Sequence, residues 1–221
     1  TEPSGSAGMA GENDIGESDA QETDAENYIK LKVRDDEAGV RALGPISVSE
    51  EELAELNRMI TKYGKKMSFK AVSTDGAKGL SYNSEAAFFA ASAIKAPYLW
   101  YCYRQIDDGN GSLEEEMTYT AQYYHGGTGD IKNSPEGTVY TLAEIMRRVI
   151  WNSDNCGYDM CVSRWGKEGY NELMDSIDCS GLKIPANSIW VSNTRAEEFV
   201  IAWKHIYDYF QTDSENAKVF Y

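Results

Sequence analysis

After Pro45 the chain shows two hydrophobic spacings, one typical of helices and one typical of strands. A capping box, Ser49 with Glu52, precedes apolar residues at helical spacing, which predicts a helix over residues 49–63. Apolar and polar residues then alternate on either side of a Thr-Asp-Gly turn, which predicts a β-hairpin over residues 67–83. The first half of the patterned region is therefore predicted to be a helix followed by a hairpin.

The segment after the hairpin is predicted to be a helix whose start is fixed by a proline. Pro97 lacks a backbone N–H and is tolerated only near the beginning of a helix. Because aromatic and apolar residues continue beyond it, the first turn must lie close to residues 92–96. This places Ser92 at a helix N-terminus, where unpaired N–H groups and the helix dipole favour developing negative charge.

Two later helices have predicted caps. A capping box at Thr141 begins one of them, and Thr194 with Glu197 is predicted to cap the last helix, over residues 194–210. The pattern as a whole predicts an α+β fold. We expect the hairpin to pack against the first and last helices, with a separate helical lobe around residues 92–180.

The charge of −15 is concentrated at the N-terminus. Residues 1–27 hold eight acidic side chains and no Lys or Arg, and they are poor in large apolar residues. Such a stretch cannot offset the entropy lost on ordering, so we predict an acidic flexible tether over residues 1–44 and one domain over residues 45–221. The acidic balance argues against a nucleic-acid partner, because phosphate neutralisation needs clustered Lys and Arg.

The sequence also bears on membranes and metals. No apolar run approaches the ~20 residues of a membrane helix, so no transmembrane segment is predicted. The cysteines show no zinc-site spacing, and both histidines lie far from them in sequence. We expect no metal and no cofactor, and we expect reduced, buried thiols. The four cysteines are Cys102, Cys156, Cys161 and Cys179.

Two short motifs could carry chemistry: Ser-Ala-Ile-Lys at residues 92–95 and Ser-Asp-Asn at residues 153–155. A Ser-x-x-Lys match alone is common and is more often a surface serine and lysine. Residues 180–183 are a second match, in a turn with no helix to align the two side chains. Ser-Asp-Asn is rarer, although a turn or helix cap would also favour these residues. The conjunction of the two motifs is what singles them out.

This conjunction resembles the first two motifs of class A β-lactamases and other penicillin-recognising serine enzymes. The linking sequence over residues 127–145, which includes Gly-Thr-Gly-Asp-Ile, resembles that family's run into its Ser-Asp-Asn helix. The preceding helix and hairpin are also in the family's order. The resemblance spans roughly residues 47–221. It implies a β-lactamase/transpeptidase-like fold, an antiparallel sheet flanked by helices with an added helical lobe.

The resemblance implies a role for each motif residue. Ser92 would be the nucleophile that forms an acyl-enzyme, and its N–H would be half of an oxyanion hole. Lys95 lies one helical turn on and could accept the Ser92 proton only if its pKa were lowered by burial or nearby cations. Ser153 would pass a proton to the leaving nitrogen, and Asn155 would bind the substrate amide. Asp154 is expected to stabilise the loop through backbone contacts.

The sequence departs from the family in two ways. Class A enzymes carry a deacylating Glu on a loop after the Ser-Asp-Asn helix, but residues 181–195 contain no Asp or Glu, and Glu197 and Glu198 are expected to cap the last helix. No Lys-Thr-Gly or Lys-Ser-Gly occurs, so we expect the C-terminal strands to be missing from this chain. They would come from another segment of the gene product, an associated fragment or a partner chain, and this chain alone would be a poor catalyst or none.

Three functions stay open. The first is a β-lactamase-like serine hydrolase that forms an acyl-enzyme with β-lactams or related amides. The second is a penicillin-binding DD-peptidase or transpeptidase-like acyltransferase, and the third is a non-catalytic cell-wall-binding module on the same scaffold. The expected substrate is a small β-lactam or a peptidoglycan peptide. Because the family's substrates lie outside the cytoplasm, we expect a bacterial, extracytoplasmic protein, secreted or anchored at the cell surface. A start at Thr1 without Met fits a removed export signal or a trimmed chain.

Overall fold

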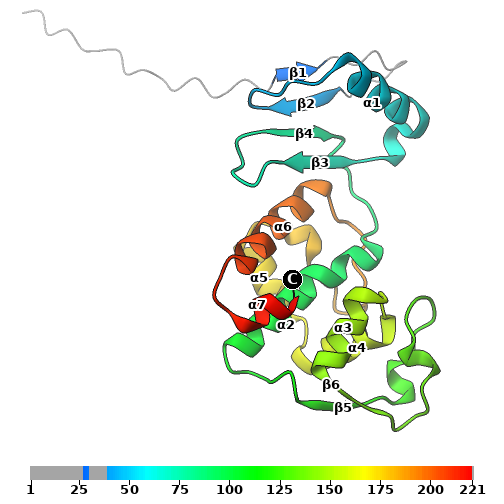
Figure 1. Cartoon of the computed structure of the whole chain (residues 1–221). Coiled ribbons are helices and arrows are strands. Elements are labelled where there is room, and N and C mark those ends of the chain that lie inside the picture. The colour runs from blue at the N-terminus through cyan, green and yellow to red at the C-terminus, as the bar shows by residue number, and fades with distance from the viewer. Residues whose placement is uncertain (1–26, 30–38, 221) are drawn as a thin grey trace, which may run out of the picture.

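The computed structural model describes residues 27–29 and 39–220. A small antiparallel sheet with helix α1 forms one region, and a larger helical lobe lies below it in Figure 1. The predicted α+β class is confirmed. None of the helices in this part of the chain is both long and apolar enough to cross a membrane.

The sheet has the order β1-β2-β4-β3, with every neighbouring pair antiparallel. The predicted hairpin is confirmed as β3 and β4, with Phe69 opposite Tyr82. The predicted first helix is also confirmed, because Ser49 and Glu52 form the capping box of α1. Ile60 of this helix is buried against the sheet with Tyr82. The bounds are β1 Asn27–Ile29, β2 Val40–Leu43, α1 Glu50–Tyr63, β3 Phe69–Val72 and β4 Gly79–Tyr82.

The structure differs from the predicted domain boundary at residue 44. Residues 40–43 form β2, which pairs with β4, and Val40 is fully buried. The ordered domain therefore begins before residue 45. The sequence signal was weak because only Val40 and Ala42 face the core, on a very short strand that follows an acidic stretch. Residues 1–26 and 30–38 of the predicted tether lie outside the described residues.

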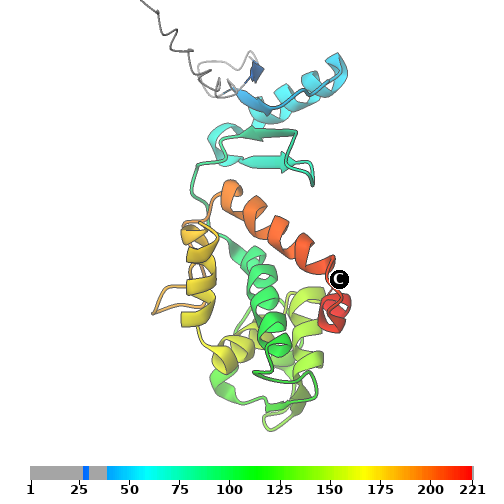
Figure 2. The ribbon, with the colours of Figure 1, turned by 90° about the vertical axis from the view of Figure 1, so that its left-hand side faces the viewer.

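Helix α2 runs through the middle of the helical lobe. Helices α3, α4, α5, α6 and α7 all contact it, and Figure 2 shows it among them. Residues 95–103 of α2 are consequently all buried. The bounds are α2 Lys95–Asp107, β5 Glu116–Thr118, β6 Val139–Thr141, α3 Leu142–Trp151, α4 Asn155–Trp165, α5 Glu168–Ser176, α6 Ala196–Phe210 and α7 Glu215–Phe220. The four cysteines are buried free thiols.

The last long helix begins one residue later than predicted. The backbone of Thr194 forms a β-bridge with Phe88, and its hydroxyl donates to the Phe88 carbonyl, so Thr194 does not cap α6. Arg195 is the N-cap instead, and its N–H donates to Glu198 at 3.1 Å. Glu197, the predicted partner of the cap, forms an ion pair with Lys70 of β3. A contact from a distant segment therefore overrides the local capping pattern.

Candidate active site

The two sequence motifs meet where α2 and α4 begin. Ser92 lies in a 3₁₀ turn, Ala91–Ile94, that leads directly into α2, and Lys95 is the first residue of that helix. Ser153 precedes the N-cap of α4, and Asn155 is its first residue. The Ser153 hydroxyl donates to the Ser92 hydroxyl at 2.7 Å. Residues 61 positions apart in the sequence therefore share one site.

Lys95 is the centre of this cluster. Its ammonium donates to the Ser153 carbonyl at 2.6 Å, to Asn155 Oδ1 at 2.7 Å and to Ser153 Oγ at 3.0 Å, and Ser92 Oγ lies 3.4 Å away. The residue is only 2% exposed. Burial lowers the pKa of Lys95 to about 8, although the Asp154 carboxylate acts in the opposite direction. A lysine with such a pKa can release and accept a proton near neutral pH, as a general base must.

Asp154 is fully buried and contacts backbone groups on two segments. One carboxylate oxygen accepts from the N–H groups of Asp130 at 2.7 Å and Ile131 at 2.9 Å, and the other accepts from Gly157 N–H at 2.9 Å. Gly129 has φ +101°, and a Cβ there would lie 2.3 Å from the Asp154 carboxyl carbon. Asp154 thus connects the loop at Asp130 and Ile131 to the start of α4. A side chain at residue 129 would clash with the carboxylate, so this close approach requires glycine there.

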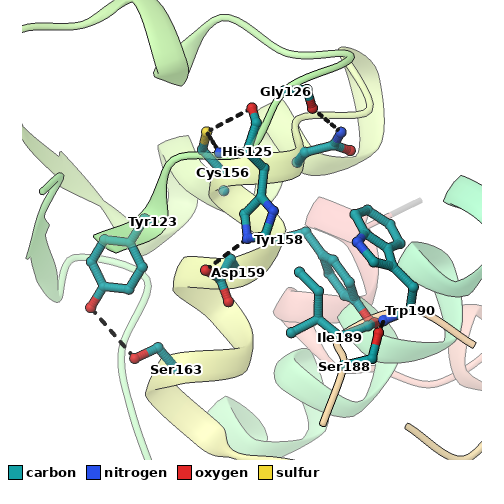
Figure 3. Close-up of polar contacts among 12 residues, drawn as sticks. Tyr123, His125, Gly126, Cys156, Tyr158, Asp159, Ser163, Ser188, Ile189 and Trp190 are labelled. Atoms are coloured by element: carbon teal, nitrogen blue, oxygen red, sulfur yellow. Dashed lines mark hydrogen bonds and ion pairs between the residues drawn. The ribbon is translucent and has the colours of Figure 1, made fainter. Parts of the chain in front are cut away.

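The Gly-Thr-Gly loop also contacts the motif residues directly. Asn155 Nδ2 donates to the Gly126 carbonyl at 2.7 Å, a contact drawn in Figure 3, and the Thr128 hydroxyl donates to the Ser153 carbonyl at 2.7 Å. These contacts fix the amide orientation of Asn155, which leaves its oxygen toward Lys95. Sequence reasoning did not assign Gly126 or Thr128 to the site, although both lie in or beside the linking sequence that carried the resemblance.

The backbone on both sides of the cluster is strained. Ala91, before Ser92, has φ +47°, and Ser153 has φ +50°. Left-handed conformations of this kind cost non-glycine residues about 1–3 kcal/mol each and are concentrated at functional sites. The strain thus falls on Ser153 itself and next to Ser92.

The second Ser-x-x-Lys match does not form a comparable site. Ser180 is exposed in a 3₁₀ turn, Ser180–Leu182, and the Lys183 ammonium pairs with Asp175 at 2.6 Å instead. Ser180 therefore lacks the contact with a buried lysine that Ser92 makes with Lys95.

No carboxylate among the described residues lies within hydrogen-bond distance of the Lys95 ammonium. Glu198 is buried but accepts from the N–H groups of Gly181 at 2.6 Å and Arg195 at 3.1 Å. The group beside Lys95 is instead the indole of Trp190, whose ring centre lies 5.5 Å from Nζ. Sequence reasoning missed Trp190, and its only signal was that it is the single aromatic residue of residues 179–195.

The α+β fold is that of the β-lactamases and penicillin-recognising serine enzymes. The profile of the beta-lactamase enzyme family matches residues 52–217, three quarters of the chain. The chain belongs to this family. A search of the curated proteins found no match.

Several solved structures share the fold. The β-lactamase from Chitinophaga pinensis has a TM-score of 0.65 and 18% identity, over 75% of this chain and 66% of its own. The β-lactamase from Sphaerobacter thermophilus and the protein PBP-A each have a TM-score of 0.62 and 19% identity, with the same coverage. The chain thus spans about two thirds of the length of these structures. At these identities the likeness establishes the fold alone.

Proposed function

We propose that this chain carries the acyl-enzyme-forming part of a β-lactamase-like serine hydrolase, acting on β-lactams or related amides. One observation carries the proposal: the buried Lys95 ammonium, with its pKa lowered to about 8, contacts the hydroxyls of both Ser92 and Ser153. Membership of the beta-lactamase enzyme family supports it. The proposal includes a bacterial, extracytoplasmic location, because β-lactams act outside the cytoplasm.

In this proposal neutral Lys95 takes the hydroxyl proton of Ser92, and Ser92 Oγ forms a bond to the substrate carbonyl carbon. The Ser92 N–H donates to the oxyanion that develops. The carbonyl–nitrogen bond then breaks, and the nitrogen receives the proton of the Ser153 hydroxyl, which Lys95 replaces from its ammonium. The chain of contacts from Lys95 to Ser153 at 3.0 Å and from Ser153 to Ser92 at 2.7 Å supports this route. Asn155 would bind the substrate amide.

A penicillin-binding acyltransferase is the second candidate. The surroundings of Lys95 favour it over a hydrolase at the deacylation step. Hydrolysis of the Ser92 ester needs an activated water, and no carboxylate of the described residues contacts Lys95 to activate one. Acylation followed by slow release is the behaviour this arrangement supports. A binding module without catalysis is the third candidate.

Labelling with a fluorescent penicillin, together with nitrocefin turnover, distinguishes these functions. In the complete protein, we expect Ser92→Ala to abolish the covalent label and Ser180→Ala, the matched control, to leave it nearly intact. Labelling that survives Ser92→Ala would contradict the assigned nucleophile. Nitrocefin turnover supports the hydrolase, a stable label without turnover supports the acyltransferase, and neither would leave the non-catalytic module.

We further propose that an added antiparallel strand pairs with the edge strand β3. A groove of about 790 Å³ lies between β3 and α6, lined by apolar side chains that include Phe69, Val72 and Phe199. β3 is the last strand of the sheet among the described residues, and α6 lies beneath it in Figure 1. An exposed edge beside an apolar surface favours strand addition. The source would be a further segment of the gene product, an associated fragment or a partner chain.

A further inference from the structure

The loop between α5 and α6 carries one large aromatic side chain, and this side chain lies beside Lys95. The ring centre of Trp190 is 5.5 Å from Lys95 Nζ. The carbonyl of the next residue, Val191, accepts from Ala90 N–H at 3.0 Å, two positions before Ser92. Trp190 thus lies beside Lys95, and the residue after it is bound to the segment that leads into Ser92.

Aromatic side chains of the helical lobe support the indole. Tyr158 of α4 packs against it with ring centres 5.4 Å apart, and His125 meets it edge-on at 6.5 Å (Figure 3). His125 is in turn paired with Asp159 of α4 at 3.0 Å. The indole thus contacts Lys95, Tyr158 and His125.

The loop that presents Trp190 is fixed by polar contacts along its length. The Lys167 ammonium donates to three carbonyls of the loop. The Tyr158 hydroxyl donates to the Ile189 carbonyl at 3.0 Å, and the backbone N–H of Trp190 donates to Ser188 Oγ at 2.9 Å. Glu198 binds Gly181 N–H, where a Cβ would lie 2.2 Å from the carboxylate. The carbonyls that accept from Lys167 are those of Pro185, Ala186 and Ser188, at 3.2, 2.9 and 2.9 Å.

Three carboxylates of the described residues near these segments have other partners. Asp154 accepts from three backbone N–H groups, Glu198 accepts from two, and Asp159 pairs with His125. A water that attacked an ester on Ser92 would therefore depend on Lys95 as its base. The indole lies beside that ammonium, with its ring centre 5.5 Å from Nζ.

We propose that Trp190 is a positioning residue that excludes water from Lys95 and thereby slows hydrolysis of the ester on Ser92. The inference rests on the proposed function, because it concerns the acyl-enzyme formed there. It assigns the lifetime of that ester to a side chain of this loop, in a stretch of sequence without Asp or Glu.

The first test measures loss of a fluorescent penicillin label after the free reagent is removed. We expect Trp190→Ala to lose the label roughly tenfold faster than the wild type, since water gains access to the ester. Trp190→Phe keeps an apolar ring and should stay within about threefold of the wild type. Trp151→Ala, at a residue that is 79% exposed, is the control and should leave the lifetime unchanged. An unchanged lifetime in Trp190→Ala would overturn the inference.

The second test does not depend on acylation. Acetic anhydride at pH 8 modifies accessible amines, and peptide mass spectrometry gives the rate at each lysine, with exposed Lys204 as the internal reference. We expect Lys95 to react roughly tenfold faster in Trp190→Ala than in the wild type or Trp190→Phe. Equal protection of Lys95 in all three proteins would contradict the water-excluding role. Exposure of Lys95 in Trp190→Ala without a penicillin label in any variant would refute the proposed function and the effect on the ester, and would support only the shielding of Lys95 by Trp190.

Discussion

The titration of Lys95 should control the rate at which Ser92 is acylated. With a pKa of about 8, the amine is about one tenth neutral at pH 7 and about nine tenths neutral at pH 9. We therefore expect the acylation rate constant to rise about tenfold between these pH values and then to level off. A lysine at the ordinary value of 10.5 would give a rise of about a hundredfold over the same range, without a plateau.

The assay is the rate of fluorescent-penicillin labelling from pH 6.5 to about 9.5, measured well below saturation. Lys183→Arg is the matched control, because that ammonium pairs with Asp175 at the surface and should leave the profile unchanged. Lys95→Arg keeps the charge but cannot deprotonate, so its rate should fall by about 10²–10⁴. A hundredfold rise without a plateau, or full activity in Lys95→Arg, would refute the reasoning.

The same pKa predicts a pH-dependent stability that needs no substrate. The folded pKa of Lys95 lies below the unfolded value of 10.5, so the unfolded state binds more protons between about pH 8 and 10.5. The contribution of Lys95 to the free energy of unfolding should therefore rise by about 2 kcal/mol from pH 8 to pH 10. Lys95→Met lacks this group. Urea unfolding at the two pH values should show the difference between wild type and variant changing by that amount, and a constant difference would contradict the lowered pKa.

Two further predictions concern the loop and the sheet edge. Asp154→Ala should lower the free energy of unfolding by about 3–5 kcal/mol, because three backbone N–H groups, two of them in buried hydrogen bonds, lose a charged acceptor. Urea unfolding followed by circular dichroism measures this, and a loss below about 1 kcal/mol would show that water replaces the carboxylate. If an added strand supplies a second oxyanion donor, as we propose, a chain extended at its C-terminus should be acylated at least about tenfold faster than this one, because removing one such donor typically costs about 10²–10³ in rate. Equal labelling rates of the two chains would show that an added strand contributes nothing to acylation.

The elements that could be predicted from the sequence are those whose ends depend on neighbouring side chains. Ser49 and Thr141 each form the capping box that the sequence indicates, and the hairpin follows its turn residues. The start of α6 could not be predicted this way. Thr194 has a suitable side chain, but its backbone is bound to Phe88, a residue 106 positions earlier. Capping rules consider only residues a few positions apart, so they do not account for a distant contact such as this one.

The candidate site, like the fold, could be predicted only in part from the sequence. The motif residues could be named from the sequence because their order along the chain resembles a known family. The pKa of Lys95 could not be predicted, since it depends on burial by α4 and by the loop that carries Trp190. Trp190 itself is not part of a helical or strand periodicity, and Lys95, which it contacts, lies 95 positions away in the sequence. A contact between two loops or helix ends produces no local sequence pattern from which it could be predicted.

The costs that the fold accepts at this site support its functional assignment. Ala91 and Ser153 adopt left-handed backbone conformations, each at about 1–3 kcal/mol. Lys95 is a buried cation without a carboxylate partner among the described residues, an arrangement that lowers its pKa and weakens folding below pH 8. None of these features is needed to pack the helical lobe, whose core is otherwise apolar and aromatic. Local departures from stable structure that converge on two serines and one lysine are expected where a protein performs chemistry.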